Sequence, residues 1–240
     1  MPGPAGRRTG ARVLDVCAGT GSLALQATKI GLQVTAIDNA PVTTAHLAEQ
    51  LLPYPGCTAE VMGALQMRWN EGEFDAAFSI FGVMFFGHQV PTVLADMRRA
   101  VRPGGVIAVV HWATPRGAPH FDNLAQASRD LDDPDIGTLD ASLPGYMSSE
   151  ALREALLTAG LVDVHAAPLH AAGAIPASES FLTELETFFA GVAGFGDLTV
   201  GQRERLNTAI VDAIRPIEEG NAPRPGFHAN LALGHVPAED

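Results

Sequence analysis

The chain has 240 residues, of which 47% are hydrophobic, and a formal net charge of −12. That length is enough to bury the core of one domain, with room for an elaboration. The acidic balance disfavours a nucleic-acid partner, because binding phosphates requires clustered lysine and arginine, and the only basic pairs, Arg7-Arg8 and Arg98-Arg99, are interpreted as solvated surface.

Cysteine usage and hydropathy indicate the compartment. The two cysteines, Cys17 and Cys57, are too few for a disulfide framework and lack the spacing of a metal pair. No apolar run reaches the ~18 residues that a membrane span requires, and the start of the chain has no signal-peptide core. We therefore expect a soluble, cytoplasmic protein with reduced thiols and no membrane partner.

The first half of the chain alternates between apolar runs and helical segments. Gly31 and Pro41 mark where one helix ends and the next begins. Strands are expected at 11–18, 33–38, 58–62, 75–81 and 106–112, and helices at 22–29, 41–52 and 91–101. Near-continuous apolar strands separated by helices predict a parallel sheet that is covered on both faces.

The second half is less regular. A helix with serine caps is expected at 148–160, a sixth strand at 161–167 and a seventh at 226–235. Between the last two strands, apolar residues recur at helical spacing in two groups: Phe181, Leu182, Leu185, Phe188, Phe189 and Val192, and then Leu206, Ile210, Val211, Ile214 and Ile217. We predict two amphipathic helices in an insertion at 173–222, with their apolar faces packed in a core.

The segment LDVCAGTGSLAL, residues 14–25, contains a glycine turn after the first strand. Gly19-Thr20-Gly21 fits one form of the dinucleotide-binding fingerprint. Asp15, in the strand that leads to the turn, would repel a pyrophosphate, because like charges interact strongly in a poorly screened site. The carboxylate instead favours a ligand with cationic groups and no phosphate, such as S-adenosylmethionine with its ammonium and sulfonium.

Asp38 ends the second expected strand, seventeen residues after Gly21. A carboxylate at that position can accept hydrogen bonds from both hydroxyls of a ribose. Asp38 therefore indicates a nucleoside ligand, but it suits NAD as well as S-adenosylmethionine.

Four segments between residues 12 and 113 follow one another in a specific order: VLDVCAGTG, VTAIDNA, GEFDAAFSIFGVMFF and MRRAVRPGGVIAVVHWA. With them the chain resembles the class I S-adenosylmethionine-dependent methyltransferases of the small-molecule type, which include ubiquinone/menaquinone-biosynthesis and natural-product enzymes. The resemblance implies a doubly wound α/β fold with a mostly parallel seven-stranded sheet and an antiparallel last strand. We expect one domain over 1–240, in which the helical insertion at 173–222, with or without the segment 114–147, shapes the acceptor pocket.

The resemblance also implies roles around the cofactor. The turn at Ala18, Gly19 and Gly21 would pass the methionine moiety, Asp15 would lie beneath its ammonium, and Asp38 would hold the ribose. The expected cofactor residues are Asp15, Ala18, Gly19, Thr20, Gly21, Asp38, Asn39, Gly63, Ala64, Ser79 and Ile80. Thr20 and Ser22 are alternatively caps of the following helix.

The chain departs from the family pattern in two places. Relatives usually carry an aspartate after the third strand that accepts from the adenine amino group, whereas here Gly63 stands there and Ala64 keeps the backbone donor. Losing this acceptor would cost ~1–3 kcal/mol unless Trp69, Met62 or water compensates. Relatives also have a helical lid before the first strand, where this chain has about eleven residues. Either the chain is a shortened form, or the inserted helices or a partner subunit close the site.

Methyl transfer needs a base only if the acceptor must lose a proton. His111, at the end of the fifth strand, and His88, after the fourth, are the candidates, with a structural role as the alternative for His111. Four aromatic residues could contact the acceptor or the sulfonium, or simply pack in the core: Phe81, Phe85, Phe86 and Trp112. No metal site is expected, because His111, His120 and Asp122 lack regular ligand spacing.

We therefore expect methyl transfer from S-adenosylmethionine to a small-molecule acceptor, at oxygen or an activated carbon rather than nitrogen. A homodimer is one expected assembly. Two alternatives stay open. One is a methyltransferase-fold protein that binds the cofactor as a partner or regulator without transferring methyl. The other is an NAD-dependent oxidoreductase, which Asp15 and the RPGG turn oppose.

Overall fold

The structure is a computed structural model that describes residues 10–114, 119–137, 139, 145–172, 194–221 and 226–238. Contacts within it divide the chain into two compact units. The first unit consists of Met1–His111, Met147–Pro168 and Asn230–Asp240, and the second of Trp112–Tyr146 and Leu169–Ala229.

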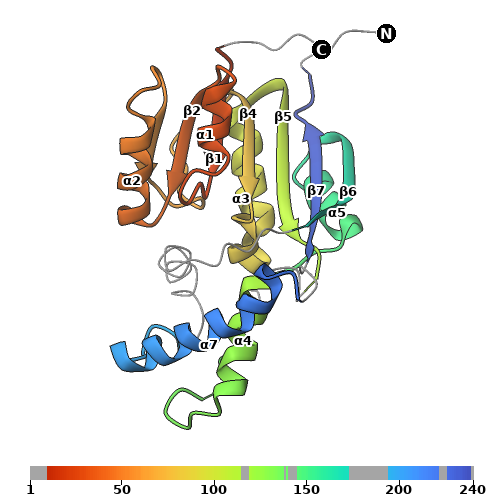
Figure 1. The fold of residues 1–240 in the computed structure, drawn as a ribbon. Coiled ribbons are helices and arrows are strands. Elements are labelled where there is room, and N and C mark those ends of the chain that lie inside the picture. Colours follow the sequence, from red (N-terminus) through yellow and green to blue (C-terminus); the bar gives the residue numbers. More distant parts are fainter. Residues whose placement is uncertain are drawn as a thin grey trace. The chain divides into compact units, whose positions relative to one another are not determined.

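Seven strands form one sheet in the order β3-β2-β1-β4-β5-β7-β6 (Figure 1). Their bounds are β1 Arg12–Val16, β2 Gln33–Asp38, β3 Thr58–Val61, β4 Phe74–Ile80, β5 Val101–Trp112, β6 Val162–Ala172 and β7 Gly226–His235. The pairs β1–β2, β1–β4, β2–β3 and β4–β5 are parallel. Strand β7 runs antiparallel to β5, since the Val236 N–H donates to Gly105 O near one end and the Ala113 N–H to His228 O near the other. The predicted sheet is therefore confirmed.

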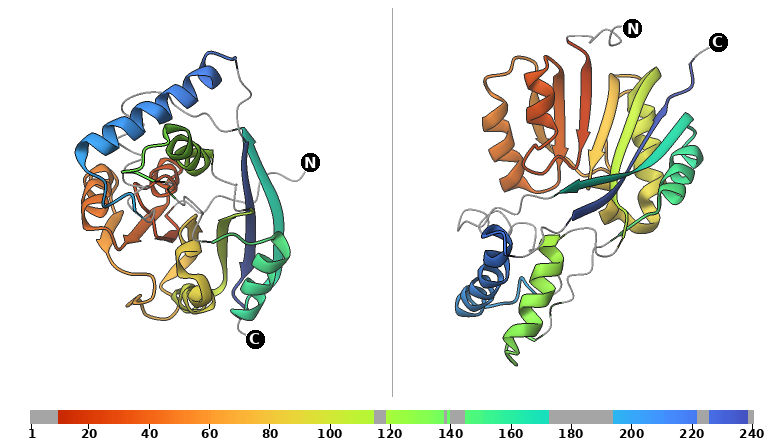
Figure 2. Two further views of the ribbon diagram at one scale, coloured as in Figure 1. Left: turned by 90° about the horizontal axis from the view of Figure 1, so that it is seen from below. Right: turned by 45° about the vertical axis from the view of Figure 1, so that its right-hand side comes forward.

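Helices cover both faces of the sheet in the first unit (Figures 1 and 2). Leu14 and Val16 of β1 pack with α3, Val90–Ala100, and α5, Ser149–Thr158. Val13, on the opposite side of the same strand, packs with α1, Ala24–Lys29, and α2, Pro41–Leu51. Because side chains alternate along a strand, Asp15 lies on the same face as Val13, toward α1.

Two helices were not expected from the sequence. They are η1, a 3-10 helix at Val83–Gln89, and α4, at Pro119–Leu131. Neither stretch begins with a residue that caps a helix through its side chain, which is the signal that correctly predicted α5, where the Ala151 N–H donates to Ser148 Oγ at 3.1 Å.

In the second unit, α4 packs along α7, Val200–Glu218 (Figure 2). Leu206, Ile210 and Ile214 of the predicted apolar stripe are buried, so the second predicted amphipathic helix is confirmed. The first predicted helix of the insertion lies outside the described residues.

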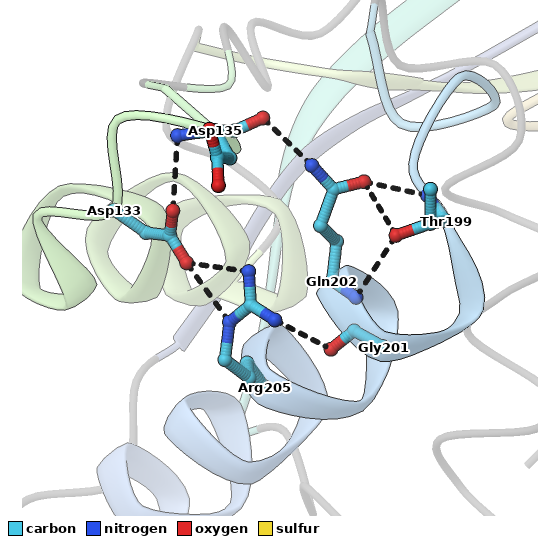
Figure 3. A network of polar contacts seen from close by, with 6 residues as sticks. All are labelled: Asp133, Asp135, Thr199, Gly201, Gln202 and Arg205. Atoms are coloured by element: carbon cyan, nitrogen blue, oxygen red, sulfur yellow. Dashed lines mark hydrogen bonds and ion pairs between the residues drawn. The ribbon is translucent and has the colours of Figure 1, made fainter.

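Polar contacts join the end of α4 to the first turns of α7 (Figure 3). Asp133 Oδ2 accepts from Arg205 Nε at 2.9 Å and Nη2 at 2.7 Å. Gln202 Nε2 donates to Asp135 O at 2.9 Å, while Gln202 Oε1 accepts from the Thr199 N–H at 2.7 Å. These contacts lower the pKa of Asp133, first through the hydrogen bond from Arg205 and then through the backbone N–H of Asp135.

In the part of the chain that the structure describes, no helix combines the length and apolarity needed to cross a membrane. Within the same residues, no three histidine, cysteine, aspartate or glutamate side chains gather as a metal site requires.

Candidate functional site

The glycine turn begins where β1 leaves the buried sheet. Val16 is fully buried, and the chain then passes through positive φ at Cys17 (59°), Gly19 (54°) and Gly21 (86°). A side chain at Gly21 would overlap the Leu47 side chain of α2, so glycine is required there by space as well as by φ. The turn therefore brings the start of α1 close to both β1 and α2.

Asp15 lies beneath this turn and is 2% exposed. Its Oδ2 accepts from the Ala24 N–H at 3.1 Å, so this carboxylate caps α1 from the neighbouring strand. The alternative that Thr20 and Ser22 cap the helix is wrong, because Leu23 holds the cap position and no side chain there makes a capping hydrogen bond.

Burial raises the pKa of Asp15 to about 7, the Ala24 N–H opposes this rise, and the charge of Asp38 adds to it. At neutral pH Asp15 is therefore divided between its protonated and ionised forms. A cationic group placed beside it would favour the ionised form.

Asp38, at the end of β2, holds two backbone N–H groups at once. Its Oδ2 accepts from Gly19 and its Oδ1 from Ala40, both at 2.9 Å. The carboxylate thus joins the glycine turn to the start of α2. The sequence predicted Asp38 as a ribose ligand but not this role, since nothing in the spacing shows which N–H groups its oxygens reach.

The carboxyl ends of β1 and β4 are joined by a buried hydroxyl. Ser79 Oγ, fully buried, donates to Val16 O at 2.9 Å. A side chain at Gly82 would overlap Cys17 Cβ, so the segment after β4 approaches the glycine turn closely. In the strand order, β1 lies between β2 and β4, and ligands of open α/β sheets bind where the order reverses in this way.

The segment after β3 begins at the same edge. The Met62 N–H donates to Asp38 O at 2.9 Å, and a turn follows in which the Gln66 N–H donates to Gly63 O at 2.9 Å. The Trp69 ring makes an edge contact with Phe74, with ring centroids 5.3 Å apart. Because Phe74 begins β4 at the opposite edge of the sheet, the interpretation of Trp69 as packing on the adenine is wrong.

Arg99, on α3, anchors that segment. Its Nη1 donates to Trp69 O and its Nη2 to Met67 O, the latter at 3.1 Å. The guanidinium is thus engaged with carbonyl groups, which corrects the interpretation of Arg98-Arg99 as merely solvated surface. Arg98 Nε likewise donates to Gly160 O at 3.2 Å.

The predicted cofactor residues all lie at or just beyond the carboxyl ends of β1 to β4, in the first unit: Asp15, Ala18, Gly19, Thr20, Gly21, Asp38, Asn39, Gly63, Ala64, Ser79 and Ile80. Their contacts with a cofactor stay predictions. Cys17 and Cys57 are free thiols, and burial raises the pKa of Cys17 to about 12.

The residues predicted for catalysis and acceptor binding differ in exposure. His111 and Trp112 end β5 and are 2% and 3% exposed, and Trp112 belongs to the second unit. His88 and Phe85 lie on η1 and are exposed, while Phe81 is half-buried with φ of 56°. Their roles stay predictions.

Comparison with known proteins agrees with this geometry. Residues 13–105 match the family model described as a methyltransferase domain. Over 122 residues, 47% of this chain and 40% of the relative, the chain is 37% identical to an uncharacterised protein of Mycobacterium tuberculosis. Over 114 residues, 48% of this chain and 46% of the relative, it is 33% identical to demethylmenaquinone methyltransferase of Beutenbergia cavernae.

A solved structure shares the fold at low sequence identity. Phosphoethanolamine N-methyltransferase 2 of Haemonchus contortus, in complex with S-adenosyl-L-methionine, matches with a TM-score of 0.59 and 20% identity, over 98% of this chain and 50% of that one. The chain spans less than half the length of the curated relatives above. Residues 13–105 are thus similar to a methyltransferase domain, and the fold is that of the solved enzyme with bound S-adenosyl-L-methionine. That segment contains every predicted cofactor residue, but neither His111 nor Trp112.

Proposed function

We propose that this chain binds S-adenosylmethionine at the carboxyl ends of β1, β2 and β4 and transfers its methyl group to a small-molecule acceptor. One observation carries the proposal: the Gly19 N–H donates to the Asp38 carboxylate. In a dinucleotide site the N–H groups of such a turn face a phosphate. Here the Asp38 carboxylate already accepts from the Gly19 N–H, and the Asp15 carboxylate lies directly below the turn. The turn therefore suits a cationic ligand and repels a pyrophosphate.

The residues present fit the proposed cofactor. Asp38 would hold the ribose hydroxyls while its backbone contacts keep the carboxylate in place. Asp15 would offset the positive charge of the amino-acid arm, with the carbonyl groups of Ser79 and Ile80 accepting from its ammonium. Bound in this way, S-adenosylmethionine would supply a methyl group already activated by the sulfonium.

The task left to the protein is alignment and exclusion of water, which together can contribute roughly 7–11 kcal/mol in favourable cases. His111 is our candidate base for an acceptor that must lose a proton, because it ends β5 at the same edge of the sheet. His88, on η1, is the second candidate. A structural role for His111 stays the alternative.

For the acceptor we propose oxygen or an activated carbon. The name of the Beutenbergia cavernae relative supports this choice, since it denotes methylation of demethylmenaquinone. The N-methyltransferase among the solved structures supports the fold alone, because its identity to this chain is only 20%. The role of 173–222 in acceptor binding, a homodimer and a cytoplasmic location stay predictions.

The test is incubation of the protein with methyl-labelled S-adenosylmethionine and a panel of phenols, quinols and amines. Asp38→Ala is the matched inactive variant. Label transferred to a phenol or quinol by the wild type, and not by Asp38→Ala, supports the proposal. Cofactor binding without transfer to any member of the panel would instead favour the silent binding protein, and NADH binding detected by fluorescence would favour the oxidoreductase.

A further inference from the structure

We propose that Gln66 binds the adenine of the cofactor, its side-chain oxygen serving as the acceptor for the 6-amino group. This inference rests on the proposed function and names a residue that the family pattern does not supply. It answers how the chain recognises adenine although Gly63 provides no carboxylate.

The turn that follows β3 lies beside the proposed ribose ligand, Asp38. The Met62 N–H donates to the backbone oxygen of Asp38 at 2.9 Å, so the segment that follows β3 begins beside the proposed ribose ligand. The base of a nucleoside is attached to its ribose, so residues next to this contact are in range of the base. Gly63 is the next residue along the chain.

The side-chain oxygen of Gln66 lies beside Gly63. A Cβ placed on Gly63 would have one atom within 4 Å, Gln66 Oε1, at 4.0 Å. The carboxylate of an aspartate at 63 would lie two bonds beyond that Cβ, in the same neighbourhood. The amide oxygen of Gln66 is therefore close to the place where an acceptor is missing.

The side-chain amide of Gln66 suits an adenine amino group. A glutamine side chain presents an acceptor oxygen, and an adenine amino group is a donor. Ala64, between the two residues, offers its backbone N–H to a ring nitrogen. One acceptor and one donor in the same turn match the donor and acceptor that adenine presents side by side.

The turn is held from both sides, which gives the backbone of Gln66 a defined position. The Gln66 N–H donates to Gly63 O, and Arg99 Nη2 donates to the Met67 carbonyl one residue further on. The Gln66 side chain itself is exposed, so its replacement should leave the fold intact.

The experiment measures affinity by calorimetry, with two probes. The probes are S-adenosylhomocysteine and its analogue that carries unsubstituted purine, without the 6-amino group, in place of adenine. The variants are Gln66→Ala, Gly63→Asp and the combination of both. Gln33→Ala is the matched control, because Gln33 is an exposed glutamine at the opposite edge of the sheet.

We expect Gln66→Ala to lower the affinity for S-adenosylhomocysteine by about three- to tenfold, the range of one hydrogen bond. Its affinity for the deamino analogue should stay unchanged. Gly63→Asp should raise the affinity for S-adenosylhomocysteine more in the Gln66→Ala background than in the wild type, because the new carboxylate then replaces the lost acceptor. Gln33→Ala should bind like the wild type.

Equal loss of affinity for both probes would overturn the assignment, since it would mean that Gln66 acts on the turn and not on the amino group. Unchanged affinity of Gln66→Ala for S-adenosylhomocysteine would overturn it as well, while leaving the proposed function intact. Failure of the wild type to bind S-adenosylhomocysteine would overturn both.

Discussion

Asp15→Asn is the substitution that tests the electrostatics of the site most sharply. Asparagine keeps the shape of the side chain and an oxygen that can accept from the Ala24 N–H, but it cannot carry a charge. The comparison with the wild type therefore isolates the buried negative charge from the helix cap.

The magnitude follows from the pKa of Asp15, which burial raises from 3.8 to about 7. Between these values the folded state holds a proton that the unfolded state has released, so wild-type stability falls as pH rises. Three pKa units correspond to about 4 kcal/mol, an upper bound because the interior relaxes around a charge. Below pH 4 the contribution vanishes, and above pH 7 it is complete.

The assay is urea unfolding, monitored by circular dichroism, at a series of pH values from 4 to 8. Asp15→Asn should match the wild type at pH 4 and exceed its free energy of unfolding by up to about 4 kcal/mol at pH 8. A difference between the two proteins that stays constant across this range would arise from packing and not from ionisation, and would rule out the buried charge as its cause.

The same ionisation should appear in cofactor binding. A cationic ligand favours ionised Asp15, so binding of S-adenosylmethionine near pH 7 should release a fraction of a proton, and affinity should rise with pH up to about 7. Calorimetry in buffers of different ionisation enthalpy measures that proton. Asp15→Asn should bind more weakly and release none.

Three further predictions concern other parts of the chain. His111→Ala should lower turnover at least about tenfold, since general base catalysis typically contributes more than that, with the Kd for S-adenosylhomocysteine unchanged; near-normal turnover would remove His111 from the mechanism. Gly82→Ala should destabilise the chain by about 1–3 kcal/mol in urea unfolding, because the new Cβ would overlap both Cys17 Cβ and Ser79 Oγ; adding Cys17→Gly should recover only part of this loss, and no recovery at all would show that Cys17 does not contribute to the strain. Asp133→Asn should speed hydrogen exchange in α4 and α7 at pH 7 but not below the lowered pKa of Asp133, where its pair with Arg205 is already lost as pH falls; an equal effect at both pH values would contradict this sign.

The sequence predicted the sheet because its strands are continuous apolar runs that end in glycine or proline signals. It placed Asp15 and Asp38 correctly for the same reason, since each lies at a fixed register at the end of a buried strand. The sequence did not predict which N–H groups the two carboxylates bind. The capping of α1 by Asp15 and the hold of Asp38 on Gly19 join residues from separate elements.

Two misjudged regions show the same limit. Trp69 lies only six residues after Gly63, yet the segment between them crosses from one edge of the sheet to the other, where Trp69 meets Phe74. Helix α4 begins at Pro119 without a serine, threonine, aspartate or asparagine directly before it, and it packs along α7. The local sequence pattern predicted neither the position of Trp69 nor helix α4, and both make tertiary contacts that the pattern does not contain.

We propose that the glycine turn, with Asp15 below it and Asp38 across it, binds a cationic nucleoside without phosphate. Calorimetric titration of the wild-type protein with S-adenosylmethionine and with NADH, at pH 8, measures it directly. We predict one-to-one binding of S-adenosylmethionine that Asp38→Ala abolishes, and no binding of NADH. Binding of NADH without binding of S-adenosylmethionine would instead identify a dinucleotide site.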